Sequence, residues 1–147
     1  MQSLKILNNK EKKPILALIK KQWGAGIEED YAFLMSNKDR IYIVNKDISR
    51  IDQSKLRINS LGLYLGELRN NEIRLSIEGA QIIGPKATKN VVDIENPREW
   101  LRGSEVETEG QSDTFVIVKN NNDFLGSGKI KDGKILNFVG KNRRLNA

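Results

Sequence analysis

The chain has 147 residues, of which 30% are charged and 38% hydrophobic, and its formal net charge is +6. It contains neither histidine nor cysteine, which excludes a Ser-His-Asp triad, a cysteine nucleophile and a zinc site of Cys and His ligands. No apolar run approaches the ~20 residues that cross a bilayer. The first residues lack the apolar segment and cleavage site of a signal peptide. We therefore expect a cytoplasmic protein with no membrane partner.

The charge is unevenly distributed along the chain. Residues 1–89 carry 16 basic and 10 acidic side chains, residues 90–118 carry 2 and 7, and residues 119–147 carry 7 and 2. A basic block beside an acidic one is typical of a polyanion-binding face with a boundary. Ordinary surface charge gives the same totals, so charge alone leaves both interpretations open.

The first part of the chain predicts helices packed on an antiparallel sheet, an α/β sandwich. A helix is expected over 10–23, with Pro14 near its first turn and glycines after Trp23. The remaining expected elements are strands over 31–35 and 41–44 around a turn at 37–39, a helical turn over 47–51, a strand over 56–68 with a bulge near 59–60, a hairpin at 70–71, and a helix over 77–83 that Ser76 caps and Gly84-Pro85 terminates.

The segment 84–90 is the expected boundary between two domains, 1–88 and 89–147. Beyond it, a strand begins at Val91, and Asn96-Pro97 starts a short helix over 98–102 that Gly103 closes. Strands are expected over 114–119, 124–131 and 134–140, joined by tight hairpins. Such strands form a small, partly closed barrel, so the predicted fold class is α+β: the sandwich followed by the barrel.

Two local patterns suggest small-ligand chemistry, and both have a simpler interpretation. The acidic triplet Glu28-Glu29-Asp30 could bind a metal through oxygen ligands, but a solvated turn is favoured. The glycines at 126 and 128 precede a lysine as in a phosphate-binding loop, yet a strand follows where such a loop needs a helix. A bulge and close strand contact explain these glycines better. We expect no metal and no cofactor.

Basic residues of the second domain are the candidate binding site. Lys129 and Lys131 alternate on one strand, so both side chains leave the same face. Lys141, Arg143 and Arg144 follow a strand that apolar residues anchor in the core, which favours a fixed cluster over a frayed end. Trp100 could stack on a base but is favoured as a core anchor. A basic helix face is favoured as a solvated surface over a second RNA contact; its members are Lys10, Lys12, Lys13, Lys20 and Lys21.

The order of these features resembles two families that share the PUA domain, a small RNA-binding β-barrel. Segments 100–105 (WLRGSE) and 125–129 (LGSGK), with Asn137, Lys141 and Arg144, resemble the PUA tail of Sun-family RNA cytosine methyltransferases. The proline usual in that last stretch is absent. The whole chain also resembles archaeal and eukaryotic ribosome-biogenesis factors with a pre-PUA and a PUA domain, through segments 40–44 (RIYIV) and 60–66 (SLGLYLG).

The resemblance implies a non-enzymatic RNA-binding factor in rRNA maturation, from an archaeon, whose partners are structured rRNA or tRNA and ribosome-assembly or RNA-modification proteins. Sun-family enzymes use cysteines at the reacting base, and this chain has none. In PUA domains the short helix and the terminal strands form the RNA face. The residues expected there are Arg98, Arg102, Gly103, Lys129, Lys131, Lys141, Arg143 and Arg144.

Three alternatives stay open at this point. The chain could be the RNA-binding partner of a separate RNA-methylating enzyme. It could instead be a protein-interaction adaptor that docks through its acidic segment 93–113. A small enzyme that relies on carboxylates is the least favoured.

Overall fold

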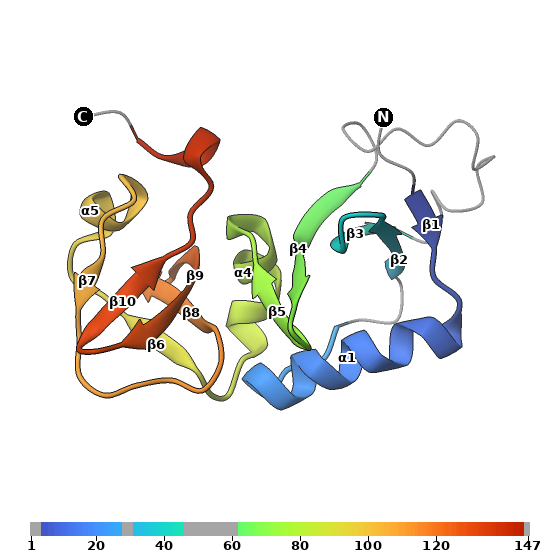
Figure 1. Cartoon of the computed structure of the whole chain (residues 1–147), viewed down its shortest axis with the longest axis horizontal. Coiled ribbons are helices and arrows are strands. Elements are labelled where there is room, and N and C mark those ends of the chain that lie inside the picture. Colours follow the sequence, from blue (N-terminus) through green and yellow to red (C-terminus); the bar gives the residue numbers. More distant parts are fainter. Residues whose placement is uncertain (1–3, 28–30, 46–61, 146–147) are drawn as a thin grey trace.

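The computed structural model describes residues 4–27, 31–45 and 62–145, and within them the chain forms two five-stranded sheets with helix α4 between them (Figure 1). The first sheet has the strand order β1-β2-β3-β4-β5, and the second has the order β6-β8-β9-β10-β7. The expected turn over 47–51 and bulge at 59–60 lie outside the described residues. In the described part of the chain, no helix combines the length and apolar character needed to cross a membrane.

Helix α1 (Asn9–Trp23) runs along the first sheet and confirms the helix predicted over 10–23. Its start is fixed by a capping box, in which the Asn8 side chain accepts from the Glu11 amide at 2.8 Å and the Asn8 amide donates to the Glu11 carboxylate at 3.1 Å. Gly24 ends the helix in the left-handed conformation (φ +69°). Pro14 lies in the second turn, not the first, because the helix begins at Asn9.

The first sheet is antiparallel throughout, as predicted. Its strands are β1 (Leu4–Ile6), β2 (Tyr31–Ser36), β3 (Arg40–Asn45), β4 (Leu63–Arg69) and β5 (Glu72–Leu75). Asn70 and Asn71 both adopt positive φ and confirm the predicted hairpin. The sequence analysis missed β1, because three residues are too short for an alternating pattern.

Helix α4 (Ile77–Ile83) begins at Ser76, whose hydroxyl accepts from the Gly79 amide at 2.9 Å, as predicted. Its expected termination at Gly84-Pro85 is wrong. Gly84 stays right-handed and the chain tightens into a 3-10 helix, η2 (Gly84–Lys86), where Pro85 is tolerated because its position needs no donor. A Cβ on Gly84 would lie 2.2 Å from the Phe124 ring, so this glycine serves the contact between α4 and the second sheet.

The second sheet curls into a partly closed barrel and confirms the predicted PUA-type architecture. Strand β6 pairs in parallel with β8, and the remaining pairs are antiparallel. Strand β10 ends at Asn137, short of the predicted Gly140, because the Asn137 side chain takes over the Val139 amide at 2.8 Å. The elements are β6 (Val91–Asp93), α5 (Pro97–Leu101), β7 (Val106–Glu107), β8 (Val116–Asn120), β9 (Asp123–Lys131), β10 (Lys134–Asn137) and the 3-10 helix η3 (Lys141–Arg143).

The glycines of β9 shape the barrel and hold no phosphate loop, as predicted. Gly126 has φ +107° where the pairing of β8 and β9 shifts register, which is a bulge. A Cβ on Gly128 would lie 2.5 Å from a methyl carbon of Ile135 and 2.9 Å from the Trp100 ring. The sheet can therefore close over Trp100 only with glycine at position 128.

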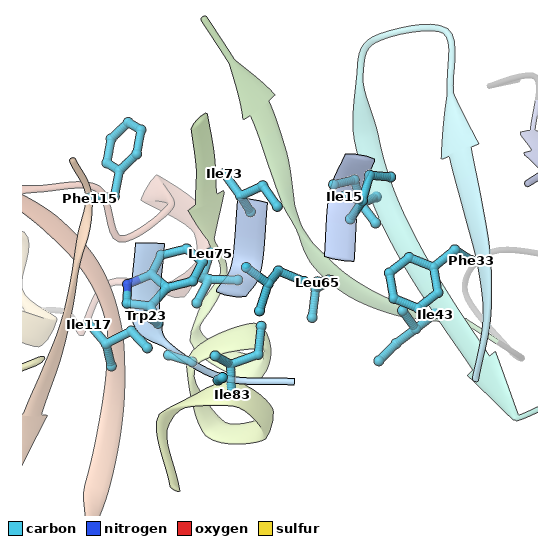
Figure 2. Packing of buried hydrophobic residues seen from close by; sticks show 14 of the residues in the cluster. Ile15, Trp23, Phe33, Ile43, Leu65, Ile73, Leu75, Ile83, Phe115 and Ile117 are labelled. Carbon is cyan, nitrogen blue, oxygen red and sulfur yellow. The ribbon is translucent and has the colours of Figure 1, made fainter. Parts of the chain in front are cut away.

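One continuous apolar core joins the two sheets. Trp23 and Ile83 of the first unit pack in the same buried cluster as Phe115 and Ile117 of the second (Figure 2). The buried Ser127 hydroxyl donates to the Leu75 carbonyl at 2.8 Å across the same junction. The predicted boundary near residue 88 therefore separates two sheets but not two cores.

Candidate nucleic-acid interface

Helix α5 is a five-residue helix whose position the core fixes. The Asn96 side chain accepts from the Glu99 amide at 3.2 Å, and Pro97 occupies the first helical position. Trp100 has 0% exposure and its indole N–H donates to the Leu125 carbonyl at 3.0 Å. Trp100 is therefore a core anchor, as favoured from the sequence, and it carries no base-stacking surface.

Hydrogen bonds tie the segment after β10 to α5. The Asn137 amide group donates to the carbonyls of Trp100, at 2.7 Å, and Ser104, at 2.9 Å. Further along, the Leu145 amide donates to the Leu101 carbonyl at 2.8 Å. Together these bonds hold η3 beside the end of α5, so the basic cluster near residue 141 starts from a fixed base, as the sequence predicted.

Gly103 and Arg144 meet at the centre of this arrangement. Gly103 has φ +96°, and a Cβ built on it would lie 2.6 Å from Arg144 Nε and within 2.9 Å of two further Arg144 atoms. Arg144 Nε also donates to the Val139 carbonyl at 3.1 Å. We expected the bare Cα of Gly103 to admit an RNA backbone, and that role is wrong because the Arg144 side chain fills the space.

The predicted cations that gather here define one surface, which we call the α5–η3 face: Arg98, Arg102, Lys141 and Arg144. Arg98 and Arg102 lie one turn apart on α5, and Arg102 forms an ion pair with Glu99 at 3.2 Å. Arg98 and Lys141 are exposed, whereas Arg144 is partly buried on Gly103. Cations held on ordered elements in this way suit phosphate contacts, since less conformational entropy is lost on binding.

The structure places the other predicted cations elsewhere. Lys129 Nζ lies 3.3 Å from Glu72 of β5 and 5.1 Å from the centre of the Phe115 ring, so it faces the junction between the units. Arg143 forms an ion pair with Glu78 of α4. Lys131 lies at the β9–β10 hairpin, beside the start of β10, whereas η3 follows the other end of that strand (Figure 1).

Sequence reasoning missed the two carboxylates that redirect these cations. Glu72 is 57 residues from Lys129, and Glu78 is 65 residues from Arg143. Local spacing carries no signal of such a distant pair. Only a correct placement of β5 and α4 against the second sheet would have indicated it.

Charge elsewhere in the described chain adds no catalytic cluster to this face. Within residues 4–27, 31–45 and 62–145, no three acidic side chains lie together in a way that could hold a metal ion. The acidic triplet Glu28-Glu29-Asp30, weighed as a metal site from the sequence, falls outside those ranges. The described arrangement therefore offers positive charge, backbone donors and a shaped surface.

Comparisons with known proteins place the second unit. The sequence profile of the PUA domain of the methyltransferase RsmF matches residues 88–145. The chain is 30% identical over 133 residues to the ribosomal RNA small subunit methyltransferase F of Aeromonas salmonicida, and equally identical to that of Aeromonas hydrophila. These alignments take in 88% of this chain and 27% of each relative, so the chain spans about a quarter of their length.

The profile match confirms the predicted resemblance to the PUA tail of Sun-family methyltransferases. The alignments exceed the length of the matched domain, so the similarity reaches into the first unit as well. The resemblance to pre-PUA ribosome-biogenesis factors and the archaeal source stay predictions. Residues 88–145 form a PUA domain similar to that of the methyltransferase RsmF.

Proposed function

We propose that this chain is a non-enzymatic RNA-binding protein that holds structured rRNA through its PUA domain during rRNA maturation. The observation that carries the proposal is the α5–η3 face, where hydrogen bonds from Asn137 and Leu145 fix a group of cations on a domain of PUA type. Fixed cations on a shaped surface favour folded RNA, whose phosphates and 2′-hydroxyls have a defined geometry. The cytoplasmic location expected from the sequence belongs to the same proposal.

A second candidate is a role in rRNA methylation as the RNA-binding partner of a catalytic subunit. The names of the two relatives, both ribosomal RNA small subunit methyltransferases, favour it. On this proposal the chain itself transfers no methyl group, because it has no cysteine to attack a base and no histidine to act as a base. Methyl transfer from S-adenosylmethionine to rRNA by the purified chain would contradict this part of the proposal.

The proposed function is tested by titrating a folded rRNA fragment and a duplex DNA of equal length with the purified chain at two salt concentrations. We expect tighter binding to the RNA and a log–log salt slope of a few units, about one for each neutralised phosphate. Equal affinity for duplex DNA, or a flat salt dependence, would contradict RNA binding. Either result would favour the rival adaptor role through the acidic segment 93–113.

A further inference from the structure

A pocket of about 370 Å³ lies where the two units meet, apart from the α5–η3 face. Its walls come from β4 and β5, from the start of α4, and from the segment between β10 and η3. A volume near the lower end of the ~300–1,000 Å³ usual for small-molecule sites suits one small planar group and excludes a nucleic-acid helix.

The pocket contains a planar cation fixed against an aromatic ring. The Arg74 guanidinium lies 5.1 Å from the centre of the Phe138 ring, and its Nη2 donates to Glu67 at 2.9 Å. Phe138 in turn packs edge-to-face on the buried Phe115, at 5.4 Å between ring centres. An arginine held from two sides in this way is a stacking platform for an unstacked base.

Tyr64 adds a second ring to the lining of the pocket. Its ring centre lies 5.5 Å from that of Tyr42, which holds it in place. Burial, with the nearby Glu67 carboxylate, raises the pKa of the Tyr64 hydroxyl above its usual value of 10.0, so the hydroxyl remains a hydrogen-bond donor at neutral pH. The pocket therefore offers a flat surface together with a polar donor.

The ionic groups around the pocket divide into paired and available ones. Glu67 holds Arg74 and also Arg69, and one oxygen of Glu78, Oε1, holds Arg143. Arg40 makes no side-chain hydrogen bond or ion pair with any residue in the part of the chain that the structure describes. A phosphate entering the pocket would find this guanidinium available, and the second oxygen of Glu78 could accept from an amino group.

We propose that the junction pocket binds a single unpaired nucleotide of the RNA, with its base against Arg74 and Tyr64, its amino group at Glu78 and its phosphate at Arg40. Adenine, cytosine and guanine each offer an exocyclic amino group to a carboxylate, and uracil offers none. The pocket thus favours bases that carry an amino group. This inference rests on the proposed function, since it assumes that the α5–η3 face delivers the RNA.

The test uses one RNA hairpin in three forms: fully paired, with one bulged adenosine, and with one bulged uridine. We expect the whole chain to bind the bulged-adenosine form about tenfold more tightly than the paired form, within the range that one stacked base contributes. The bulged-uridine form should fall between them. If no form binds, the proposed function itself fails. If all three bind equally, RNA binding stands and the nucleotide pocket is wrong.

A pair of conservative variants locates the effect. Arg74→Lys keeps the charge but removes the planar guanidinium, so it should abolish the preference for the bulged adenosine while leaving binding of the paired hairpin unchanged. Arg69→Lys is the matched control, because Arg69 contacts the same Glu67 but does not line the pocket. Equal losses in the two variants would overturn the assignment. If Arg74→Lys fails to fold, the wild-type comparison of the three hairpins still decides.

Discussion

Two basic surfaces of the molecule carry similar charge but differ in how they hold it. On α1, Lys10, Lys13, Lys20 and Lys21 project into solvent from a helix whose backbone is already satisfied. On the α5–η3 face, Arg144 is bound to the Val139 carbonyl and packed on Gly103, and the surrounding chain is tied down by Asn137. A long free lysine loses more entropy on binding than a cation fixed beforehand. The position of the charge, and not its amount, therefore distinguishes the two surfaces.

The largest expected effect comes from removing the cluster around η3. Changing Lys141, Arg143 and Arg144 together to alanine should weaken binding of folded rRNA by well over tenfold. It should also lower the salt slope by up to about three, near one for each lost phosphate contact. Fluorescence anisotropy at several salt concentrations measures both quantities. Because Arg144 packs on Gly103, this variant should also lose about 1 kcal/mol of stability, more than the ~0.5 kcal/mol usual for surface changes.

The matched control removes three lysines from α1: Lys10, Lys13 and Lys20. Lys12 is left in place, because its amine donates to the Tyr31 carbonyl at 3.1 Å and lies over the Phe33 ring. We expect this triple variant to weaken binding less than about threefold, as non-specific charge loss does. A larger loss from α1 than from η3 would place the RNA face on the first unit.

A smaller effect is expected from Gly103→Ala, which tests whether Arg144 must pack on a bare Cα. The substitution adds a Cβ 2.6 Å from Arg144 Nε at a residue with φ +96°. We expect a loss of about 2 kcal/mol, which lowers the melting temperature by about 4–8 °C. Gly110→Ala is the control: φ is +82° but no atom lies within 4 Å of the added Cβ, so only about 1 kcal/mol of backbone strain applies. Equal losses would mean that the contact with Arg144 contributes nothing.

The sequence predicted most of the local structure, because the signals for it are local. Asn96-Pro97, Ser76, the Asn70-Asn71 turn and Gly126 each act within a few residues of their own position. The same signals could not predict how the units pack. Gly84 was expected to stop a helix, and instead it makes room for Phe124, 40 positions further along the chain.

The candidate site was predicted in part for the same reason. Arg98, Arg102, Lys141 and Arg144 belong to elements that the sequence located correctly, and the structure brings those elements together. Lys129 was expected on the same face because residues alternate along a strand. That face of β9 turned out to contact Glu72 of the first unit. A long-range ion pair decides the environment of this lysine, and no spacing rule reports it.

Lys129→Met should separate a structural lysine from a binding one. The change removes the ion pair with Glu72 and the contact with the Phe115 ring, which together contribute about 1 kcal/mol at a partly exposed site. We expect a lower melting temperature and an RNA affinity unchanged within about twofold. Combining it with Glu72→Gln in a double-mutant cycle should give a coupling energy, because the two side chains share one interaction. An affinity loss without any change in stability would return Lys129 to the binding face.

The smallest effect is expected from Lys131→Ala. Lys131 is exposed at the β9–β10 hairpin, paired in register with Lys134, at the end of β10 away from η3. We expect its loss to change RNA affinity less than about twofold, whereas Lys141→Ala should weaken binding several-fold and lower the salt slope by about one. Both variants remove one exposed lysine from the same domain, so only position differs between them. If Lys131→Ala matches Lys141→Ala in both affinity and slope, the RNA extends along β10 to the hairpin, and the wider face predicted from the sequence is right.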